Sequence, residues 1–312
     1  MNLGVDIGGT RTKWVLMDEC RMYKKGLIKS PKFNCGGSEL VDFLAGLFSN
    51  FHSSRVQKIG ISFAGPIDWK NGVILDAPHF SNLKNYPLVQ ELLKKTKVKA
   101  KIYLENDVNT FTLAEATRGA GQRLDMILGL AVGTGIGGGI VYNSLKHKTQ
   151  NTKHLPTLSL QRRGGKNYQI YHGKHGFASE FGHMIIQKNG PKCSCGRKGC
   201  LEAMASISFL EKKFKKDIWT IEKRARRGEK KYKKGYFELA ENLAVGVANL
   251  FNIFDPDVVV IGGGILHAWD IINKNLILKT KTMVFDSAKK FVKIKKSKLG
   301  KDFPSAIGAA LL

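Results

Sequence analysis

The sharpest chemical signal in this sequence is a histidine followed closely by three cysteines. The group consists of His183, Cys193, Cys195 and Cys200. One imidazole and three thiolates form a set that suits tetrahedral zinc, and the glycines between the cysteines allow the chain to fold around an ion. Because four protein ligands leave no position open, we expect a structural zinc ion. Glu180 and Glu202 flank the group and are expected to be free to bind hydroxyl groups.

Two glycine-rich loops suggest binding of phosphate. Residues 8–10 read Gly-Gly-Thr between Asp6 and Lys13, and residues 133–139 read Gly-Thr-Gly-Ile-Gly-Gly-Gly. Glycine has no Cβ, so backbone N–H groups in such loops can approach a phosphate closely. An ordinary turn remains the alternative for each loop alone, whereas two loops of this kind in one chain favour phosphate. Asp6 would then face a magnesium ion.

A carboxylate that could act as a general base stands at Asp107. The pair Asn106-Asp107 follows an expected strand over residues 98–104 and opens an expected helix over 108–117. A carboxylate held at such a junction can take a proton from a hydroxyl group. The alternative is that Asp107 is a plain N-cap of the helix.

The elements that must position these residues alternate between strand and helix. Apolar residues 3–7 and 13–17 predict a hairpin, and residues 126–132 and 140–142 predict a second hairpin around the other glycine loop. A helix is expected over residues 38–51, with Ser38 as its N-cap. Further elements are expected as strands at 56–63 and 257–261, the latter ending in Gly262-Gly263-Gly264, and as helices at 206–214, 235–254 and 304–312.

The repeated hairpin predicts an α/β architecture of two related lobes, with mixed sheets flanked by helices and a central cleft. We expect a small N-terminal lobe over residues 1–117, to which a closing helix at 303–312 returns. The large lobe would cover residues 118–302. It would include the metal segment 180–202 and a basic insertion at 144–170, which carries no acidic residue.

The composition is that of a folded chain with a basic surface. Lys and Arg number 51 against 25 Asp and Glu, giving a net charge of +26, and 43% of the residues are hydrophobic, which excludes a disordered chain. The longest apolar stretch, residues 128–141, is too short to cross a bilayer. No secretory leader precedes the first strand, so a cytoplasmic protein is expected. Cys20 and Cys35 are expected to be free thiols.

Taken together, these motifs resemble the ROK group of repressors, uncharacterised reading frames and sugar kinases, within the actin-like ATPase (ribonuclease H-like) superfold. The similarity covers nearly the whole chain, and the His-Cys segment is its most specific part. The other matching stretches are residues 6–10, 60–68, 105–107, 133–139, 260–264 and 306–310.

The resemblance implies an ATP-dependent kinase of a hexose or N-acylhexosamine. Asp107 would deprotonate the sugar hydroxyl, usually that on C6, and His183 would present one ring nitrogen to the sugar and the other to zinc. The implied sugar-binding residues are Gly65, Asn106, Asp107, Glu180, His183 and Glu202. ATP and Mg²⁺ would be held by Asp6, Gly8, Gly9, Thr10, Lys13, Gly133, Thr134, Gly135, Gly262, Gly263 and Gly264.

Several alternatives stay open beside this interpretation. The absence of Asp and Glu over residues 126–179 would also suit polyphosphate as the donor, and a non-catalytic sugar sensor is conceivable. The family's repressors carry a helix-turn-helix domain ahead of the fold, for which the six residues up to Asp6 leave no room. Without a recognition motif, we expect no specific nucleic-acid binding.

The basic run 212–234 is expected to be a solvated helix surface. The resemblance also implies a homo-oligomer, a dimer or tetramer, but does not choose the sugar.

The basic insertion 144–170 has two interpretations. It could be a solvated ornament, or a mobile lid that closes over sugar and donor and attracts an anionic donor by its charge.

Overall fold

The computed structural model describes residues 1–18, 21–31, 36–51, 56–77, 83–146, 160–161, 167–300 and 303–312. The chain divides into two compact units. Unit 1 comprises Met1–Gly119, Val141–Ala178 and Asp302–Leu312, and unit 2 comprises Ala120–Ile140 and Ser179–Lys301. The predicted boundary differs in one respect, because Val141–Ala178 falls in unit 1 and not in the larger lobe. Its strand β11 (Asn167–Ile170) packs against a helix of unit 1, which explains the assignment.

Unit 1 is built on a five-stranded mixed sheet with the strand order β3-β2-β1-β4-β7. Strands β1, β2 and β3 form an antiparallel meander, as the glycine elbow predicted, whereas β4 and β7 run parallel to β1. The parallel strands bring Ile7, Phe63 and Asn106 to the same edge. The strands are β1 (Asn2–Ile7), β2 (Arg11–Met17), β3 (Met22–Lys29), β4 (Lys58–Phe63) and β7 (Lys101–Asn106).

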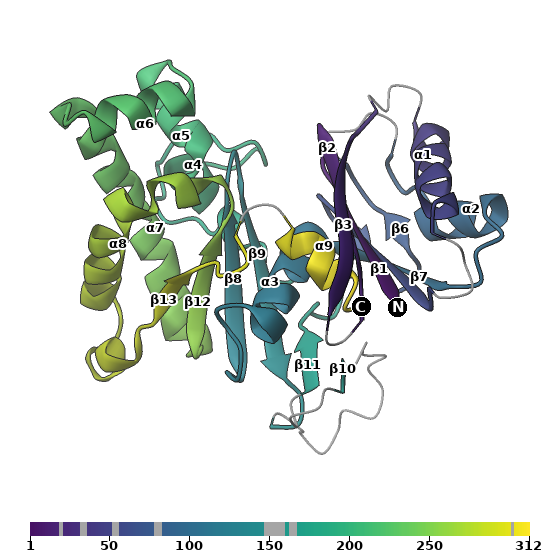
Figure 1. Cartoon of the computed structure of the whole chain (residues 1–312). Coiled ribbons are helices and arrows are strands. Elements are labelled where there is room, and N and C mark those ends of the chain that lie inside the picture. Colours follow the sequence, from purple (N-terminus) through teal and green to yellow (C-terminus); the bar gives the residue numbers. More distant parts are fainter. Residues whose placement is uncertain are drawn as a thin grey trace. The chain divides into compact units, whose positions relative to one another are not determined.

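Helices and a small hairpin complete unit 1 (Figure 1). They are α1 (Gly37–Ser49), α2 (Leu88–Lys95), α3 (Asp107–Arg118) and α9 (Pro304–Ala309), with the hairpin β5 (Ile67–Asp68) and β6 (Val73–Ile74). The predicted N-cap of α1 is wrong. Ser38 lies inside the helix, and Gly36 holds the cap position at a φ of 95°, which favours glycine. Gly37 then packs so closely that an added Cβ would stand 2.0 Å from the Tyr86 ring.

Helix α9 approaches the sheet and α3 through glycines. A Cβ at Gly60 of β4 would stand 1.9 Å from the carbonyl oxygen of Ala309, and one at Gly308 would stand 1.8 Å from that of Thr110 in α3. Backbone therefore packs directly on backbone, and no larger residue fits without moving the helix.

Strands of the second sheet have the order β10-β11-β9-β8-β12-β13, and the boundary between the units falls within β9. In unit 2, β8, β12 and β13 run parallel. The predicted glycine loop 133–139 is too long, because β9 already begins at Ile136. The strand needs its glycines, since a Cβ at Gly138 would stand 2.1 Å from the carbonyl oxygen of Ser179. The strands are β8 (Met126–Val132), β9 (Ile136–Asn143), β10 (Leu160–Gln161), β12 (Val258–Gly262) and β13 (Ile294–Lys296).

Helices of unit 2 surround one large apolar core, to which β8, β12, α7 and α8 all contribute. The predicted long helix begins five residues early, at Lys230, and the basic run 212–234 covers the end of α5, all of α6 and the start of α7, with most of its side chains exposed. The elements are α4 (Leu201–Ala205), α5 (Ile207–Phe214), α6 (Ile218–Arg226), α7 (Lys230–Phe254) and α8 (Trp269–Met283), with 3-10 turns η1 (Phe181–His183), η2 (Gly264–Ala268) and η3 (Asp286–Phe291).

Two predictions concern residues that lie wholly or largely outside the described part of the chain. Cys20 and Cys35 lie outside the described residues, as does most of the basic insertion, whose described parts are residues 144–146, 160–161 and 167–170. Among the described helices, none combines the length and the apolar character needed to cross a bilayer.

The close packing of α9 gives a first prediction. Gly60→Ala should lower the stability of the protein by about 1–3 kcal/mol or more, because the added methyl group overpacks a backbone contact. Gly46→Ala is the control. Gly46 lies exposed in α1 with no atom within 4 Å of its Cβ position, so alanine should be neutral or stabilising there. Thermal unfolding of both variants measures the difference, and equal melting temperatures would contradict the packing argument.

Candidate functional site

Asp6 stands near the carboxyl end of β1, and a chain of hydrogen bonds connects its side chain to the main chain of Asp107. The hydroxyl of Ser62 donates to Asp6 Oδ1 at 3.0 Å, and Thr110 Oγ1 lies 3.1 Å from Ser62 Oγ and 2.9 Å from the carbonyl oxygen of Asp107. Burial raises the pKa of Asp6, while Lys13, opposite it on β2, and the Ser62 hydroxyl act to lower it. A cation at this carboxylate would likewise favour its charged form.

The first glycine loop divides into a structural and an open half. Gly8 donates its N–H to the carbonyl oxygen of Arg11 at 3.2 Å and accepts from the Ser30 hydroxyl at 2.6 Å. A Cβ at Gly8 would stand 2.7 Å from the Arg11 oxygen, whereas a Cβ at Gly9 would meet nothing within 4 Å. Gly9 and Thr10 are exposed. The open half is therefore where a ligand can approach the backbone.

The junction between β7 and α3 shows which residue is the N-cap of the helix. The side-chain oxygen of Asn106 accepts from the N–H groups of Val108 and Asn109, at 2.9 and 3.2 Å, and its amide nitrogen donates to the carbonyl oxygen of Gly65 at 3.1 Å. Asn106 is thus the N-cap of α3, and the alternative that Asp107 is the cap is wrong. Asp107 is the first residue of the helix, and its carbonyl oxygen also accepts from the Ser305 hydroxyl at 3.1 Å.

Glu105 was given no role by the sequence analysis, yet it fixes this junction. Its carboxylate, of which 1% is exposed, accepts from the N–H of Asn106 at 2.9 Å and from the side-chain amide of Asn109 at 3.0 Å. Its second oxygen lies 2.6 Å from Nε2 of His172. An acidic residue at the end of a strand was the only signal in the sequence, because its partner His172 is 67 residues away.

The second glycine loop, now residues 133–135, lies beside the loop 262–264 within unit 2. Gly133 donates to the carbonyl oxygen of Gly135 at 2.8 Å and accepts from the N–H of Ile207 at 2.7 Å. A Cβ at Gly263 would stand 2.6 Å from the carbonyl oxygen of Val132, and one at Gly264 would stand 4.0 Å from the Cα of Gly133. The two predicted donor loops are therefore brought together.

A cavity of about 100 Å³ adjoins these loops, with Ile207 and Gly264 in its wall. The exposed indole of Trp219 meets the ring of His267 edge-on, at 4.6 Å between centroids. Tyr236, of which 1% is exposed, also lines the cavity, and its hydroxyl has no hydrogen-bond partner among the described residues. No pattern in the sequence indicated these three side chains, because they come from α6, α7 and η2 and meet only in the fold.

Glu202 is not free, contrary to the prediction. One carboxylate oxygen accepts from the N–H of Ile136 at 2.9 Å, and the other accepts from the Ser194 hydroxyl at 2.9 Å. A Cβ at Gly135 would stand 2.5 Å from this carboxylate, which explains the glycine there. The oxygen that accepts from Ser194 also lies 3.8 Å from Cys193 Sγ. Glu202 therefore connects the cysteine segment to the second glycine loop.

The histidine and the three cysteines do meet. Their ligand atoms all lie within 4.8 Å of one another. Cys193 Sγ lies 3.7 Å from His183 Nδ1, and Cys195 Sγ lies 3.7 Å from Cys200 Sγ. Ligands of a tetrahedral zinc ion, at about 2.0–2.3 Å from the metal, stand at such separations, so the donor set fits a zinc ion in chemistry and in spacing.

Glu180 precedes η1, and its carbonyl oxygen accepts from the N–H of His183 at 3.0 Å. Burial of part of Glu180 raises the pKa of its carboxyl, His183 opposes this effect, and the nearby Glu202 carboxylate adds to it. The raised pKa makes the protonated form of this carboxyl more accessible than it is in an exposed glutamate.

Two mixed sheets flanked by helices, with glycine loops at the ends of β1, β8 and β12, define an α/β chain of the actin-like ATPase fold. The family model described as "ROK family" matches residues 2–153 and 166–312, and the chain belongs to the ROK family.

Three similar proteins illustrate the relationship. The glucokinase of Thermotoga maritima is 33% identical over 291 residues, which cover 86% of this chain and 84% of that protein. The N-acetyl-D-glucosamine kinase of Vibrio cholerae is 29% identical and covers 100% of this chain and 99% of its own. Among solved structures, the ROK hexokinase from Thermus thermophilus superposes with a TM-score of 0.79 at 28% identity, covering 99% of this chain and 96% of its own.

The bond between Glu202 and the glycine loop yields a second prediction. Glu202→Ala should destabilise the protein by about 1–3 kcal/mol, because the Ile136 N–H loses its acceptor in a partly buried position. Glu202→Gln keeps an acceptor oxygen and should lose clearly less. Chemical unfolding of both variants provides the comparison. If alanine and glutamine had equal effects, the hydrogen bond to Ile136 would not be what matters.

Proposed function

We propose that this chain is an ATP-dependent kinase that phosphorylates a hexose or an N-acylhexosamine on the C6 hydroxyl. The observation that carries the proposal is the placement of Asp107. It directly follows the N-cap Asn106, and its carbonyl oxygen accepts from the hydroxyl groups of Thr110 and Ser305. A general base must stand in such a defined position to act on a hydroxyl group.

In the proposed step, an Asp107 carboxylate oxygen takes the proton of the sugar hydroxyl. The oxygen of the sugar forms a bond to the γ-phosphorus of ATP, and the bond between that phosphorus and the β–γ bridging oxygen breaks to release ADP. Phosphoryl transfer asks little covalent chemistry of the protein, so positioning and charge account for most of the catalysis. Mg²⁺, when bound, neutralises charge on the donor phosphates, and Asp6 would hold it through water.

The choice of ATP over polyphosphate is supported by the aromatic cavity beside the donor loops. Trp219 and His267 offer ring faces and edges, and the unpartnered Tyr236 hydroxyl offers a hydrogen bond. A polyphosphate has no ring that could use such groups, whereas a purine has both a π face and polar edges. The loops 8–10 and 133–135 would hold the phosphates.

The sugar-binding residues are proposed as Gly65, Asn106, Glu180, His183 and Glu202. Both polar atoms of the Asn106 side chain already bond within unit 1, so its contribution would be to present Gly65 and Asp107. The two kinases similar to this chain act on different sugars by their names, glucose and N-acetyl-D-glucosamine, and both are candidates. The homo-oligomer implied by the resemblance stays a prediction.

The family also contains repressors, and the test must separate an enzyme from a sugar sensor. Purified protein is assayed with glucose, mannose, N-acetylglucosamine and N-acetylmannosamine, by ADP release when ATP is the donor and by formation of the sugar phosphate when polyphosphate is the donor. Turnover with one sugar supports the proposal. Sugar binding without turnover under any donor would favour the sensor.

A third prediction concerns the base. Asp107→Asn should lower kcat at least ~100-fold while sugar affinity changes little, because an amide can hold a hydroxyl but cannot accept its proton. Asp42→Asn, on the exposed face of α1, is the matched control and should keep full activity. Retention of more than about a tenth of the wild-type turnover would show that Asp107 is not the base.

We also propose that His183, Cys193, Cys195 and Cys200 hold one structural zinc ion per chain. The ion would order the segment from η1 to α4. Glu180, His183 and Glu202 all lie on that segment, so the metal would act on sugar binding through their placement and not through chemistry of its own.

The fourth prediction follows from this site. Elemental analysis should find one zinc per chain in the wild type and less than about half of that in Cys200→Ser, whose melting temperature should fall because a ligand is lost. Cys20→Ser, which removes a cysteine outside the cluster, should change neither value. A metal-free wild-type preparation with an unchanged melting temperature would refute a structural role.

A further inference from the structure

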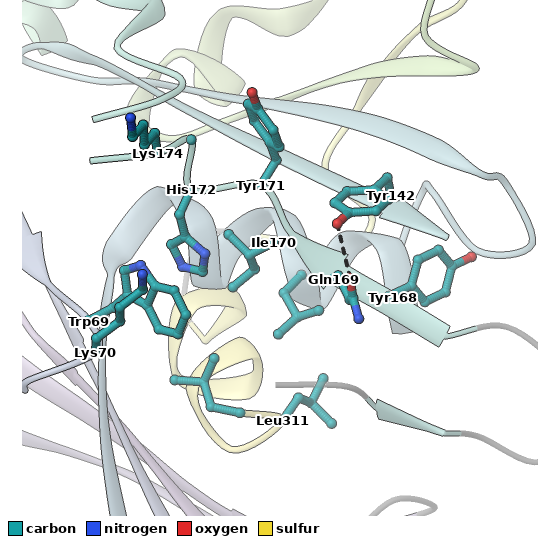
Figure 2. Close-up of a pocket in the computed structure, with 13 residues that line it drawn as sticks. Trp69, Lys70, Tyr142, Tyr168, Gln169, Ile170, Tyr171, His172, Lys174 and Leu311 are labelled. Carbon is teal, nitrogen blue, oxygen red and sulfur yellow. Dashed lines mark hydrogen bonds between the residues drawn. The ribbon is translucent and has the colours of Figure 1, made fainter. Parts of the chain in front are cut away.

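A cavity of about 320 Å³ lies within unit 1 and has no part in the function proposed above. Helix α3, the end of β9, strand β11 with the turn that follows it, the turn after β5 and the residues after α9 form its wall (Figure 2). Its volume falls within the range of sites for small organic ligands, about 300–1,000 Å³. All of the residues that line it belong to unit 1.

The wall is mostly apolar and rich in aromatic rings. Trp69, Tyr142, Tyr168 and Tyr171 contribute rings, and the buried side chains of Leu113 and Leu311 contribute aliphatic surface. Trp69 is stacked on His172 with 4.1 Å between ring centroids and 16° between planes, which gives the wall a flat, fixed section. Flat aromatic walls favour a ligand with an aromatic ring, through stacked and edge contacts.

The polar atoms of the cavity do not suit a sugar. The Tyr142 hydroxyl donates to Gln169 Oε1 at 3.0 Å, so these two groups already satisfy each other (Figure 2). A sugar would bring many hydroxyl groups into a wall that offers few partners, and unpaired polar groups are costly to bury.

The charges of the wall favour an anion. Lys70 and Lys174 line the cavity with exposed side chains, and no Asp or Glu is among the described residues that line it. The Glu105 carboxylate lies behind His172 and is 1% exposed, and a main-chain oxygen of Leu312, which also lines the cavity, accepts from Lys58 Nζ at 3.0 Å. A cation would therefore meet two ammonium groups without an Asp or Glu partner, although the rings alone could have accepted it.

We propose that this cavity is a binding site for a small planar aromatic anion, an aromatic ring that carries a carboxylate, sulfonate or phosphate group. The ring lies among the aromatic and leucine side chains, and the anionic group faces Lys70 and Lys174. An occupant that touches His172 is one hydrogen bond from Glu105 and two from the main chain of Asn106. The proposal does not depend on the kinase activity.

The test uses calorimetric titration of the full chain with three probes. 2-Naphthoate carries both a flat ring and a charge, 2-naphthylmethanol keeps the ring without the charge, and octanoate keeps the charge without the ring. We expect 2-naphthoate to bind at least about fivefold more tightly than either of the others, because 2-naphthylmethanol lacks the two exposed charge contacts and octanoate lacks the ring contacts. Tighter binding of octanoate, equal binding of the two naphthalenes, or no binding at all would overturn the proposal.

Variants of residues that line the cavity test whether the probes bind there. The double variant Lys70→Glu/Lys174→Glu should weaken 2-naphthoate about tenfold and leave 2-naphthylmethanol unchanged, whereas the control Lys24→Glu on the edge strand β3 should change neither. Ile170→Trp should abolish binding by filling the cavity. If that variant fails to fold, Trp69→Leu, at a partly exposed position, serves instead and should weaken both naphthalenes. Binding that survives in a folded filled variant would place the ligand elsewhere and refute the site.

Discussion

The arrangement at the start of α3 depends on one buried carboxylate. Glu105 is almost completely withdrawn from water, and such a group is tolerated only when hydrogen bonds replace the water. The bonds from Asn106, Asn109 and His172 do so. They also fix three parts of unit 1 relative to one another. These are the end of β7, the first turn of α3 and the segment after β11 that carries His172. Loss of any of these bonds would leave a buried carboxyl group with fewer hydrogen-bond partners, so the main chain at the start of α3 is strongly constrained.

Unit 2 has a comparable constraint in Glu202. Its carboxylate lies against Gly135, bonds Ile136 and Ser194, and so connects the cysteine segment with a loop proposed to hold phosphate. If a zinc ion orders the cysteine segment, it also restricts the motion of this loop through Glu202, without contacting the loop itself. The metal cluster, Glu202 and the loop 133–135, all within unit 2, would then form one mechanical unit.

The sequence predicted what depends on neighbouring residues. Alternating apolar runs identified most strands, the His-Cys spacing identified a cluster that does meet, and the glycine elbows marked real turns. What it missed depends on distant partners: His172 with Glu105, Ile136 with Glu202, and the rings of Trp219, Tyr236 and His267. The overlong second glycine loop has the same origin. Glycine in a sequence is often interpreted as a turn, but Gly138 is a glycine because another segment packs where its side chain would be.

The glycine contacts of α9 also bear on how the chain is made. The helix fills a gap against β1, β4 and α3, yet its residues 304–309 follow the whole of unit 2 in the sequence. During synthesis, the ribosome must complete unit 2 before unit 1 can close its core. The apolar surface of β1 and β4 that α9 covers therefore stays exposed while about 180 further residues are added. At usual rates of translation this takes roughly ten to forty seconds. This protein should accordingly depend on chaperones more during translation than its final stability would suggest, and a stalled ribosome would leave unit 1 as the part open to proteolysis.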